Sequence, residues 1–199
     1  MITQTGTHAS LLARLGQSLD GGGDAAWREF VERYGELIRG FCRSRGVLGA
    51  DCDDVVQDVL FSLAKAMPGF KYDPAKGKFR SYLKTVTIHA IFRKSGQKQP
   101  GATLQDFESM THAAAGDEAV DATWEQEWRR YHLRRAMQVI DAEFSSRDRS
   151  AFTRYAVGGE DAAIVSKDLG MSVDALYQIK TRITRRLAQL IEQQVQDEG

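Results

Sequence analysis

The sequence has few residues that interrupt helices or form covalent crosslinks. Its 199 residues include only three prolines and two cysteines. Scarce proline and long stretches with an apolar period of 3.6 residues predict an all-α fold. Cys42 and Cys52 are ten residues apart, outside any CxxC or Cys/His ligand spacing, so we expect ordinary buried thiols in a reducing cytoplasm.

Long apolar runs are also missing. No stretch approaches 18 consecutive apolar residues, and the N-terminus has no basic segment followed by an apolar one. We therefore expect a cytoplasmic protein without a transmembrane helix or an export signal.

Positive charge is absent from one segment of the chain. Residues 101–127 contain seven Asp/Glu and no Lys/Arg, whereas residues 24–98 carry a net charge of +5 and residues 128–199 a net charge of +2. This segregation, hidden by a total charge of zero, favours a polyanionic partner. It predicts a leader (1–23), two small helical domains (24–98 and 128–199) and a flexible acidic linker (99–127).

A helix is predicted to begin at the acidic cluster near residue 51. Its core-facing stripe comprises Val55, Val56, Val59, Leu60, Leu63 and Met67. The opposite face carries Asp54, Gln57, Asp58 and Phe61. An aromatic ring among carboxylates on a solvent face indicates a docking surface for a partner with basic and apolar groups.

Two other interpretations of the acidic cluster are open. The carboxylates can be a solvated helix start that the helix dipole favours, or they can hold Mg²⁺ in a phosphoryl-transfer enzyme. No phosphate-binding glycine loop or histidine partner accompanies them. The sequence thus predicts no catalytic residue, no metal and no cofactor.

A basic loop follows, in which Asp73-Pro74 and Gly77 favour a turn that presents lysines beside aromatic residues. That composition suits single-stranded nucleic acid, because bases stack on rings while ammonium groups hold phosphates. The next predicted helix begins at Arg80.

The last organised segment has the pattern of a helix-turn-helix unit. A short helix from Ala162 leads to a turn at Gly170, and a Ser172 cap opens a longer helix. The outward face of that longer helix carries Gln178, Thr181, Arg182 and Arg185, with Asp174 and Ala175 beside them. Arg and Gln can supply paired donors to purine edges in a major groove.

Two stretches resemble conserved region 2 of the extracytoplasmic-function (group 4) RNA polymerase sigma factors. They are Asp51-x-Asp53-Asp54-Val55-Val56-Gln57-Asp58-Val59 and Tyr72-Asp73-Pro74-x-x-Gly77-x-Phe79-Arg80-x-Tyr82-Leu83. Three more resemble region 4 of the same family. They are Ser145-Ser146-Arg147-Asp148-Arg149-x-x-Phe152, Leu169-Gly170-Met171-Ser172-Val173 and Lys180-x-Arg182-x-x-Arg185-Arg186-Leu187.

The resemblance implies a sigma factor whose partners are core RNA polymerase and promoter DNA. In this family region 2 binds the β′ clamp helices and opens the −10 element, while region 4 binds the β flap and reads the −35 element. The implied core-binding residues are Asp53, Asp54, Gln57, Asp58 and Phe61. The implied −10 contacts are Lys71, Tyr72, Lys76, Lys78, Arg80, Ser81, Lys84, His89 and Arg93. The implied −35 contacts are Ser172, Asp174, Ala175, Tyr177, Gln178, Lys180, Thr181, Arg182 and Arg185.

Many members of that family are restrained by an anti-sigma protein, so such a protein is a further expected partner, and no small-molecule substrate is implied. The chain departs from the family pattern at two places. His89 stands where an Asn is usual, and Arg93-Lys94-Ser95-Gly96 replaces an Asp-x-x-Arg-Arg run. Ala175-Leu176-Tyr177-Gln178-Ile179 replaces the usual Thr-Val-Lys-Ser-Arg. The alternative function is a helix-turn-helix regulator that binds its operator without polymerase.

Overall fold

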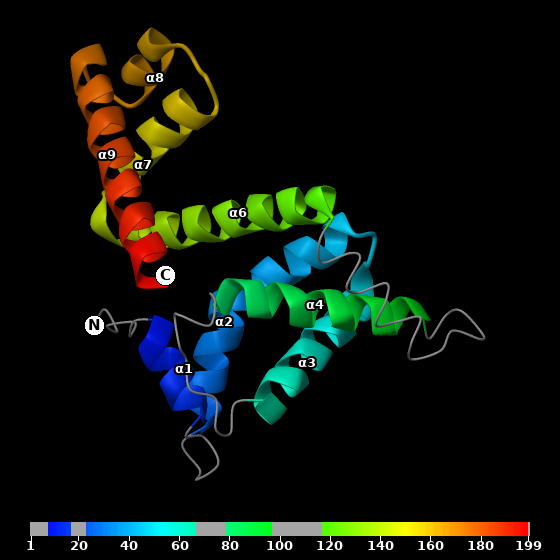
Figure 1. Ribbon diagram of the computed structural model, residues 1–199. Coiled ribbons are helices and arrows are strands. Elements are labelled where there is room, and N and C mark those ends of the chain that lie inside the picture. The colour runs from blue at the N-terminus through cyan, green and yellow to red at the C-terminus, as the bar shows by residue number, and fades with distance from the viewer. Residues whose placement is uncertain (1–7, 17–22, 67–78, 97–116, 199) are drawn as a thin grey trace. The chain divides into compact units, whose positions relative to one another are not determined.

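The computed structural model describes residues 8–16, 23–66, 79–96 and 117–198 (Figure 1). In these ranges every regular element is a helix, so the all-α prediction is confirmed. No helix of the described ranges is long and apolar enough to cross a membrane. The chain divides into two compact units, Met1–Tyr131 with Asp197–Gly199 (unit 1) and His132–Gln196 (unit 2).

Unit 1 contains α1 (His8–Gly16), α2 (Gly23–Ser44), α3 (Gly49–Ala66), α4 (Phe79–Gly96) and the amino-terminal half of α6 (Glu118–Glu143). The turn between α2 and α3 needs glycine, because Gly46 and Gly49 have φ values of 78° and 56°, where a side chain would be strained.

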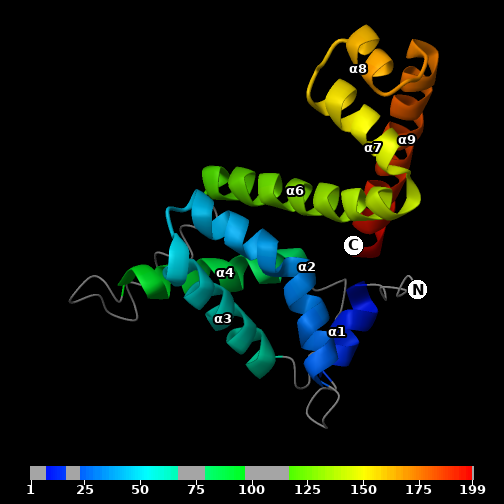
Figure 2. The same ribbon diagram turned by 180° about the vertical axis from the view of Figure 1, so that it is seen from behind.

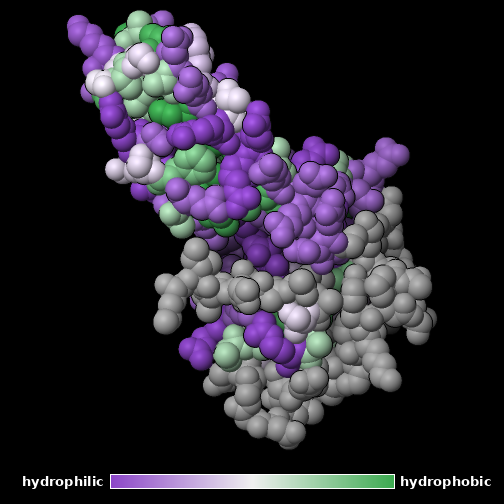
Figure 3. Space-filling view, turned by 90° about the vertical axis from the view of Figure 1, so that its left-hand side faces the viewer, coloured by the Kyte–Doolittle hydropathy of each residue, from purple (hydrophilic) through white to green (hydrophobic). Residues whose placement is uncertain are grey.

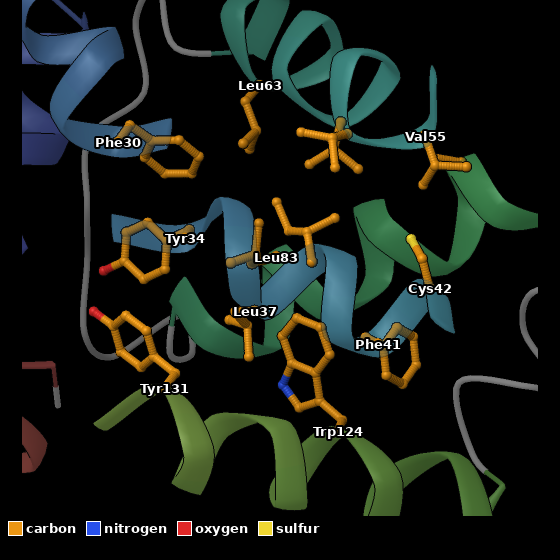
Figure 4. Close-up of a cluster of buried hydrophobic side chains, with 14 of the residues drawn as sticks. Phe30, Tyr34, Leu37, Phe41, Cys42, Val55, Leu63, Leu83, Trp124 and Tyr131 are labelled. Atoms are coloured by element: carbon orange, nitrogen blue, oxygen red, sulfur yellow. The ribbon is translucent and has the colours of Figure 1, made fainter. Parts of the chain in front are cut away.

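The core of unit 1 forms around α2, whose apolar residues recur every three or four positions. Phe30, Tyr34, Leu37 and Phe41 are at most 1% exposed and face side chains of α3, α4 and α6 (Figure 4). Their spacing places them on one side of the helix, which explains the burial. Cys42 and Cys52 are free buried thiols in this core, as predicted, and burial raises the pKa of Cys42.

The leader is attached to unit 1. Leu11, Leu12 and Leu15 of α1 are at most 3% exposed and belong to the core of that unit. Three leucines on one face of a short helix are enough to anchor it by apolar burial.

The carboxyl end of the expected acidic linker is also structured. Residues 118–127 are helical, and Val120, Trp124, Trp128 and Tyr131 of α6 are buried in the core of unit 1. Figures 1 and 2, which view the molecule from opposite sides, both show this half of α6 beside α2 and α4. Spacings of three and four residues make these four an apolar stripe despite their acidic neighbours. Residues 99–116 of the expected linker lie outside the described residues.

Unit 2 contains the rest of α6, then α7 (Ser146–Phe152), a π-helical turn (Thr153–Val157), α8 (Ala162–Asp168) and α9 (Val173–Glu198). Each of the two short α-helices starts at a side-chain cap. Ser145 Oγ accepts a hydrogen bond from Asp148 N at 3.1 Å, and Asp161 accepts from the first backbone amides of α8.

The predicted helix-turn-helix geometry is present in α8 and α9. Gly170 in the turn has a φ of 61°, and Ser172 Oγ accepts a hydrogen bond from Ala175 N at 3.1 Å. The small Ser166 is 4% exposed, as expected where the two helices approach closely. The buried side of α9 is a stripe of Leu176, Ile179, Ile183, Leu187 and Leu190.

Candidate functional site

The five residues implied in polymerase binding lie on one side of α3. At about 100° per residue, Asp53 to Phe61 fall within about 140° of arc, and Phe61 lies near the middle. The side chain of Phe61 is 60% exposed, and Lys65 Nζ lies 4.1 Å from the centroid of its ring. Asp53, Asp54 and Gln57 are exposed, whereas Asp58 is half-buried. An exposed ring therefore has acidic groups on its amino-terminal side and Lys65 on the next turn.

The carboxylates on this face are held by basic residues of neighbouring helices. Arg39 Nε donates to Asp53 Oδ1 at 3.2 Å, and Lys94 Nζ lies 2.5 Å from Asp54 Oδ2 and 3.2 Å from Asp51 Oδ1. The hydrogen bonds that Lys94 donates to Asp54 and Asp51 raise the pKa of Lys94. Within the described residues no group of three His, Cys, Asp or Glu side chains is placed to hold a metal ion. Asp53 and Asp54 are thus ion-paired with α2 and α4.

The nine implied −10 contacts fall into three groups. Lys71, Tyr72, Lys76 and Lys78 lie outside the described residues. On α4, Ser81, His89 and Arg93 are exposed, and Arg93 Nη2 donates to Ser62 Oγ at 3.3 Å.

The third group, Arg80 and Lys84, lies on another side of α4 and faces α6. Lys84 Nζ is 2.6 Å from Asp121 Oδ1, and Arg80 forms an ion pair with Glu125. The side chains of Arg80 and Lys84 are only 25% and 16% exposed, and burial lowers the pKa of Arg80. Four residues of helical spacing separate the two cations, which explains their shared direction.

The outward face of α9 is open. Asp174, Gln178, Thr181 and Arg185 are exposed and lie opposite the buried stripe of the helix. The upper part of the surface in Figure 3 mixes hydrophilic and hydrophobic residues. An exposed polar face at the start of the second helix of a helix-turn-helix unit has the composition needed to enter a major groove.

Two other implied −35 contacts lie at the flanks of this face. On one flank, Arg182 Nη2 is 3.1 Å from Asp148 Oδ2, and its guanidinium carbon lies 5.8 Å from the centroid of Phe144. On the other flank, Tyr177 packs against Tyr155 with ring centroids 5.7 Å apart. Arg182 is still 61% exposed, so it can reach a ligand only by sharing or leaving Asp148.

Lys180 belongs to the same flank as Tyr177, because its Nζ lies 5.2 Å from the centroid of Tyr155. Of the remaining implied contacts, Ala175 is half-buried and Ser172 acts as the cap of α9. The implied set therefore divides into an outward group and a group already engaged within unit 2.

Several residues that hold α8 and the helix-turn-helix turn were assigned no role from the sequence. Arg147 Nε donates to Leu169 O at 2.9 Å, and Arg147 Nη2 also donates to Gly170 O in the helix-turn-helix turn. Arg154 pairs with Glu160 at 2.6 Å and with Asp168 at 2.9 Å. Such contacts join positions 6 to 23 residues apart. They connect different elements, so the spacing of residues within one helix does not predict them. The hydrogen bonds from Arg154 lower the pKa of Glu160.

Comparison with known proteins assigns the first domain. Residues 30–99 match the family model described as Sigma-70 region 2. No curated protein matches the chain. Among solved structures, the one titled "Structure of CnrH in complex with the cytosolic domain of CnrY" matches with 20% sequence identity and a TM-score of 0.34, over 92% of this chain and 96% of that chain.

The family match spans most of α2, all of α3 and all of α4, the helices that form the acidic face around Phe61 and the polar surface of α4. The resemblance read from the sequence motifs is thereby confirmed for this part of the chain: residues 30–99 are a sigma-70 region 2 domain.

Proposed function

We propose that the protein is an alternative sigma factor of the extracytoplasmic-function group, which binds core RNA polymerase and directs initiation at specific promoters. The observation that carries this proposal is the position of Phe61, 60% exposed among carboxylates on α3, inside a sigma-70 region 2 domain. An exposed phenyl ring adds no stability to a helix start that only faces solvent. At a protein interface the same ring can contribute much of the binding free energy.

The chemistry of this face fits a basic helical surface with apolar groups between its cations. Asp53 and Asp54 have side chains 62% and 55% exposed, so both can add contacts beyond their present partners. Such rim charges steer association, while the ring supplies buried contact area. We assign the α3 face to the polymerase β′ clamp helices, in line with the family resemblance.

Two surfaces are assigned to promoter DNA. Exposed polar residues of α4, among them Ser81, His89 and Arg93, are suited to the −10 element. The outward face of α9, with Gln178 and Arg185, is suited to the −35 element through the major groove. Engagement of both helices by one promoter requires no enzyme chemistry from this chain.

The test is binding of the full chain to purified core polymerase. The variant Asp54→Ala with Phe61→Ala should weaken binding at least tenfold, because truncation at an interface hot spot costs about 2 kcal/mol or more. The matched control is Glu192→Ala with Val195→Ala, which also removes one exposed acid and one exposed apolar side chain, on α9. Equal affinity of both variants, each with a native circular dichroism spectrum, would contradict the assignment.

The helix-turn-helix unit of α8 and α9 is also compatible with a second function, that of an operator-binding regulator that acts without polymerase. Selection of binding sites from a random DNA library separates the two. A sigma factor should select a two-part sequence only when core polymerase is present, whereas a regulator should select its operator as the free chain.

A further inference from the structure

The amino-terminal half of α6 occupies the side of α4 that carries Arg80 and Lys84. The two helices are antiparallel at this contact, because Arg80 pairs with Glu125 and Lys84 with Asp121. Both pairs of partners have a four-residue spacing, which keeps each on one helix face. Two cations of the region 2 domain are thus matched by two carboxylates from the chain that follows it.

An aromatic contact accompanies the charges. The guanidinium carbon of Arg80 lies 5.0 Å from the ring centroid of Trp128. Single-stranded nucleic acid offers a similar set of groups, with anionic oxygens for the cations and a flat ring for stacking. The amino-terminal half of α6 therefore offers α4 the same two features as a nucleic acid, namely anionic oxygens and a flat ring.

Apolar burial holds α6 in this place. Val120, Trp124 and Trp128 are 1%, 2% and 5% exposed. Trp124 points toward Phe41 and Leu37 of α2 (Figure 4), and its ring centroid is 5.0 Å from that of Phe41. A Cβ at Gly40 would meet the carboxylate end of Glu127, so a larger residue there would require that side chain to move.

The ion pairs themselves add little to this attachment. Asp121 and Glu125 have side chains 50% and 47% exposed, and half-exposed ion pairs contribute little to stability. Apolar burial would hold the helix in place even with neutral residues at both positions. The carboxylates of Asp121 and Glu125 are therefore not explained by stability.

We propose that the amino-terminal half of α6 is an internal mimic of DNA, which covers Arg80 and Lys84 in the free protein and leaves when promoter DNA is engaged. This inference rests on the proposed sigma-factor function. It means that the free chain binds DNA weakly through α4, because the carboxylates of α6 occupy both cations until they are neutralised by substitution or until α6 is displaced on assembly with polymerase.

The test compares two charge-matched variants of the full chain without polymerase. One is Asp121→Asn with Glu125→Gln. The control is Glu32→Gln with Glu36→Gln, whose side chains are exposed on α2 of the same unit and have the same four-residue spacing. The probe is a fluorescein-labelled single-stranded DNA of mixed sequence, titrated by anisotropy at several salt concentrations.

If α6 is a mimic, the first variant should bind the probe about tenfold more tightly than the control at low salt. Two additional phosphate contacts should also steepen the plot of log K against log salt by about 1.4, since each contact on a single strand contributes about 0.7. Adding Arg80→Ala and Lys84→Ala to that variant should abolish both gains.

Three results would overturn the proposal. They are equal gains in both variants, no gain in either, or a gain that persists after Arg80 and Lys84 are removed. Binding to core polymerase is measured on the same samples. If polymerase binding depends on Phe61 but the first variant gains no affinity for the DNA probe, the mimic alone is rejected. If polymerase binding does not depend on Phe61, the proposed function is rejected.

Discussion

The two helices implied in DNA recognition differ in what their cations contact. On α4, Arg80 and Lys84 are mostly covered by acidic residues of α6. On α9, Arg185 is exposed, and the flanking Arg182 and Arg186 are held by acids of unit 2 without closing the outward face. A basic residue in a suggestive motif is therefore not yet a free DNA contact, because its intramolecular partner decides its availability.

The largest expected effect tests whether the start of α6 belongs to unit 1. Trp124→Ala should destabilise unit 1 by about 3–5 kcal/mol, because it empties a buried aromatic site. Hydrogen exchange followed by mass spectrometry should show lost protection in α2 and α4 and unchanged protection in α7 to α9. The control is Gln126→Ala, an exposed position on the same helix. Equal protection in both variants would restore the linker interpretation and remove the basis for a covered α4.

The next effect concerns which arginine of α9 reads a base. Arg185 lies on the outward face, whereas Arg182 is engaged by Asp148 and Phe144. Arg185→Ala should cost about 1–3 kcal/mol and relax selectivity at one position of the −35 element. Arg182→Ala should cost less and weaken all sequences similarly. Binding of the assembled holoenzyme to a library of −35 variants measures both, and the reverse ranking would show that Arg182 leaves Asp148 on binding.

A smaller effect tests how the helix-turn-helix turn is fastened. Arg147→Ala removes two hydrogen bonds to the carbonyls of Leu169 and Gly170 and should destabilise unit 2 by about 1 kcal/mol. Lys167→Ala is the control, because it removes an exposed cation of α8. Thermal unfolding of the two variants should differ, and coincident curves would make the Arg147 contacts unimportant to the position of α9.

Much of the fold could be predicted from local pattern. The stripes of α2, α3 and α9 and the caps at Ser145 and Ser172 depend on residues within a few positions of one another. The start of α6 could not be read in this way, because its acidic residues suggested a solvated segment while Val120 and Trp124 were buried by α2 and α4. Apolar burial by distant elements outweighed local composition.

The candidate site shows the same limit. The acidic face around Phe61 is a property of one helix, so its residues share a side as the spacing required. The direction of Arg80 and Lys84 depends on α6, about 40 residues farther along the chain. The four-residue spacing predicts that Arg80 and Lys84 share a face of α4, but it does not predict what that face contacts.

The smallest expected effect is a pH dependence in unit 2. Arg186 donates to both carboxylate oxygens of Glu143, at 2.6 and 2.8 Å, and these hydrogen bonds lower the pKa of Glu143 below its usual value of 4.5. Between the folded and unfolded pKa values the unfolded chain binds more protons, so this contribution to stability is complete above about pH 4.5 and is lost as pH falls through the folded pKa. Both side chains are 36% exposed, which limits the contribution to less than about 1 kcal/mol.

Melting temperatures of the unmodified chain and of Glu143→Gln, measured from pH 6 to pH 3, should therefore differ most at pH 6 and converge on acidification. Glu192→Gln, at an exposed position of α9, controls for the loss of one acid. High salt should reduce the difference at pH 6, because exposed pairs are screened. A difference that stays constant down to pH 3 would mean that Glu143 does not hold Arg186 through its charge. Arg186 would then be available to DNA, and the division of α9 into engaged flanks and an open face would fail at that position.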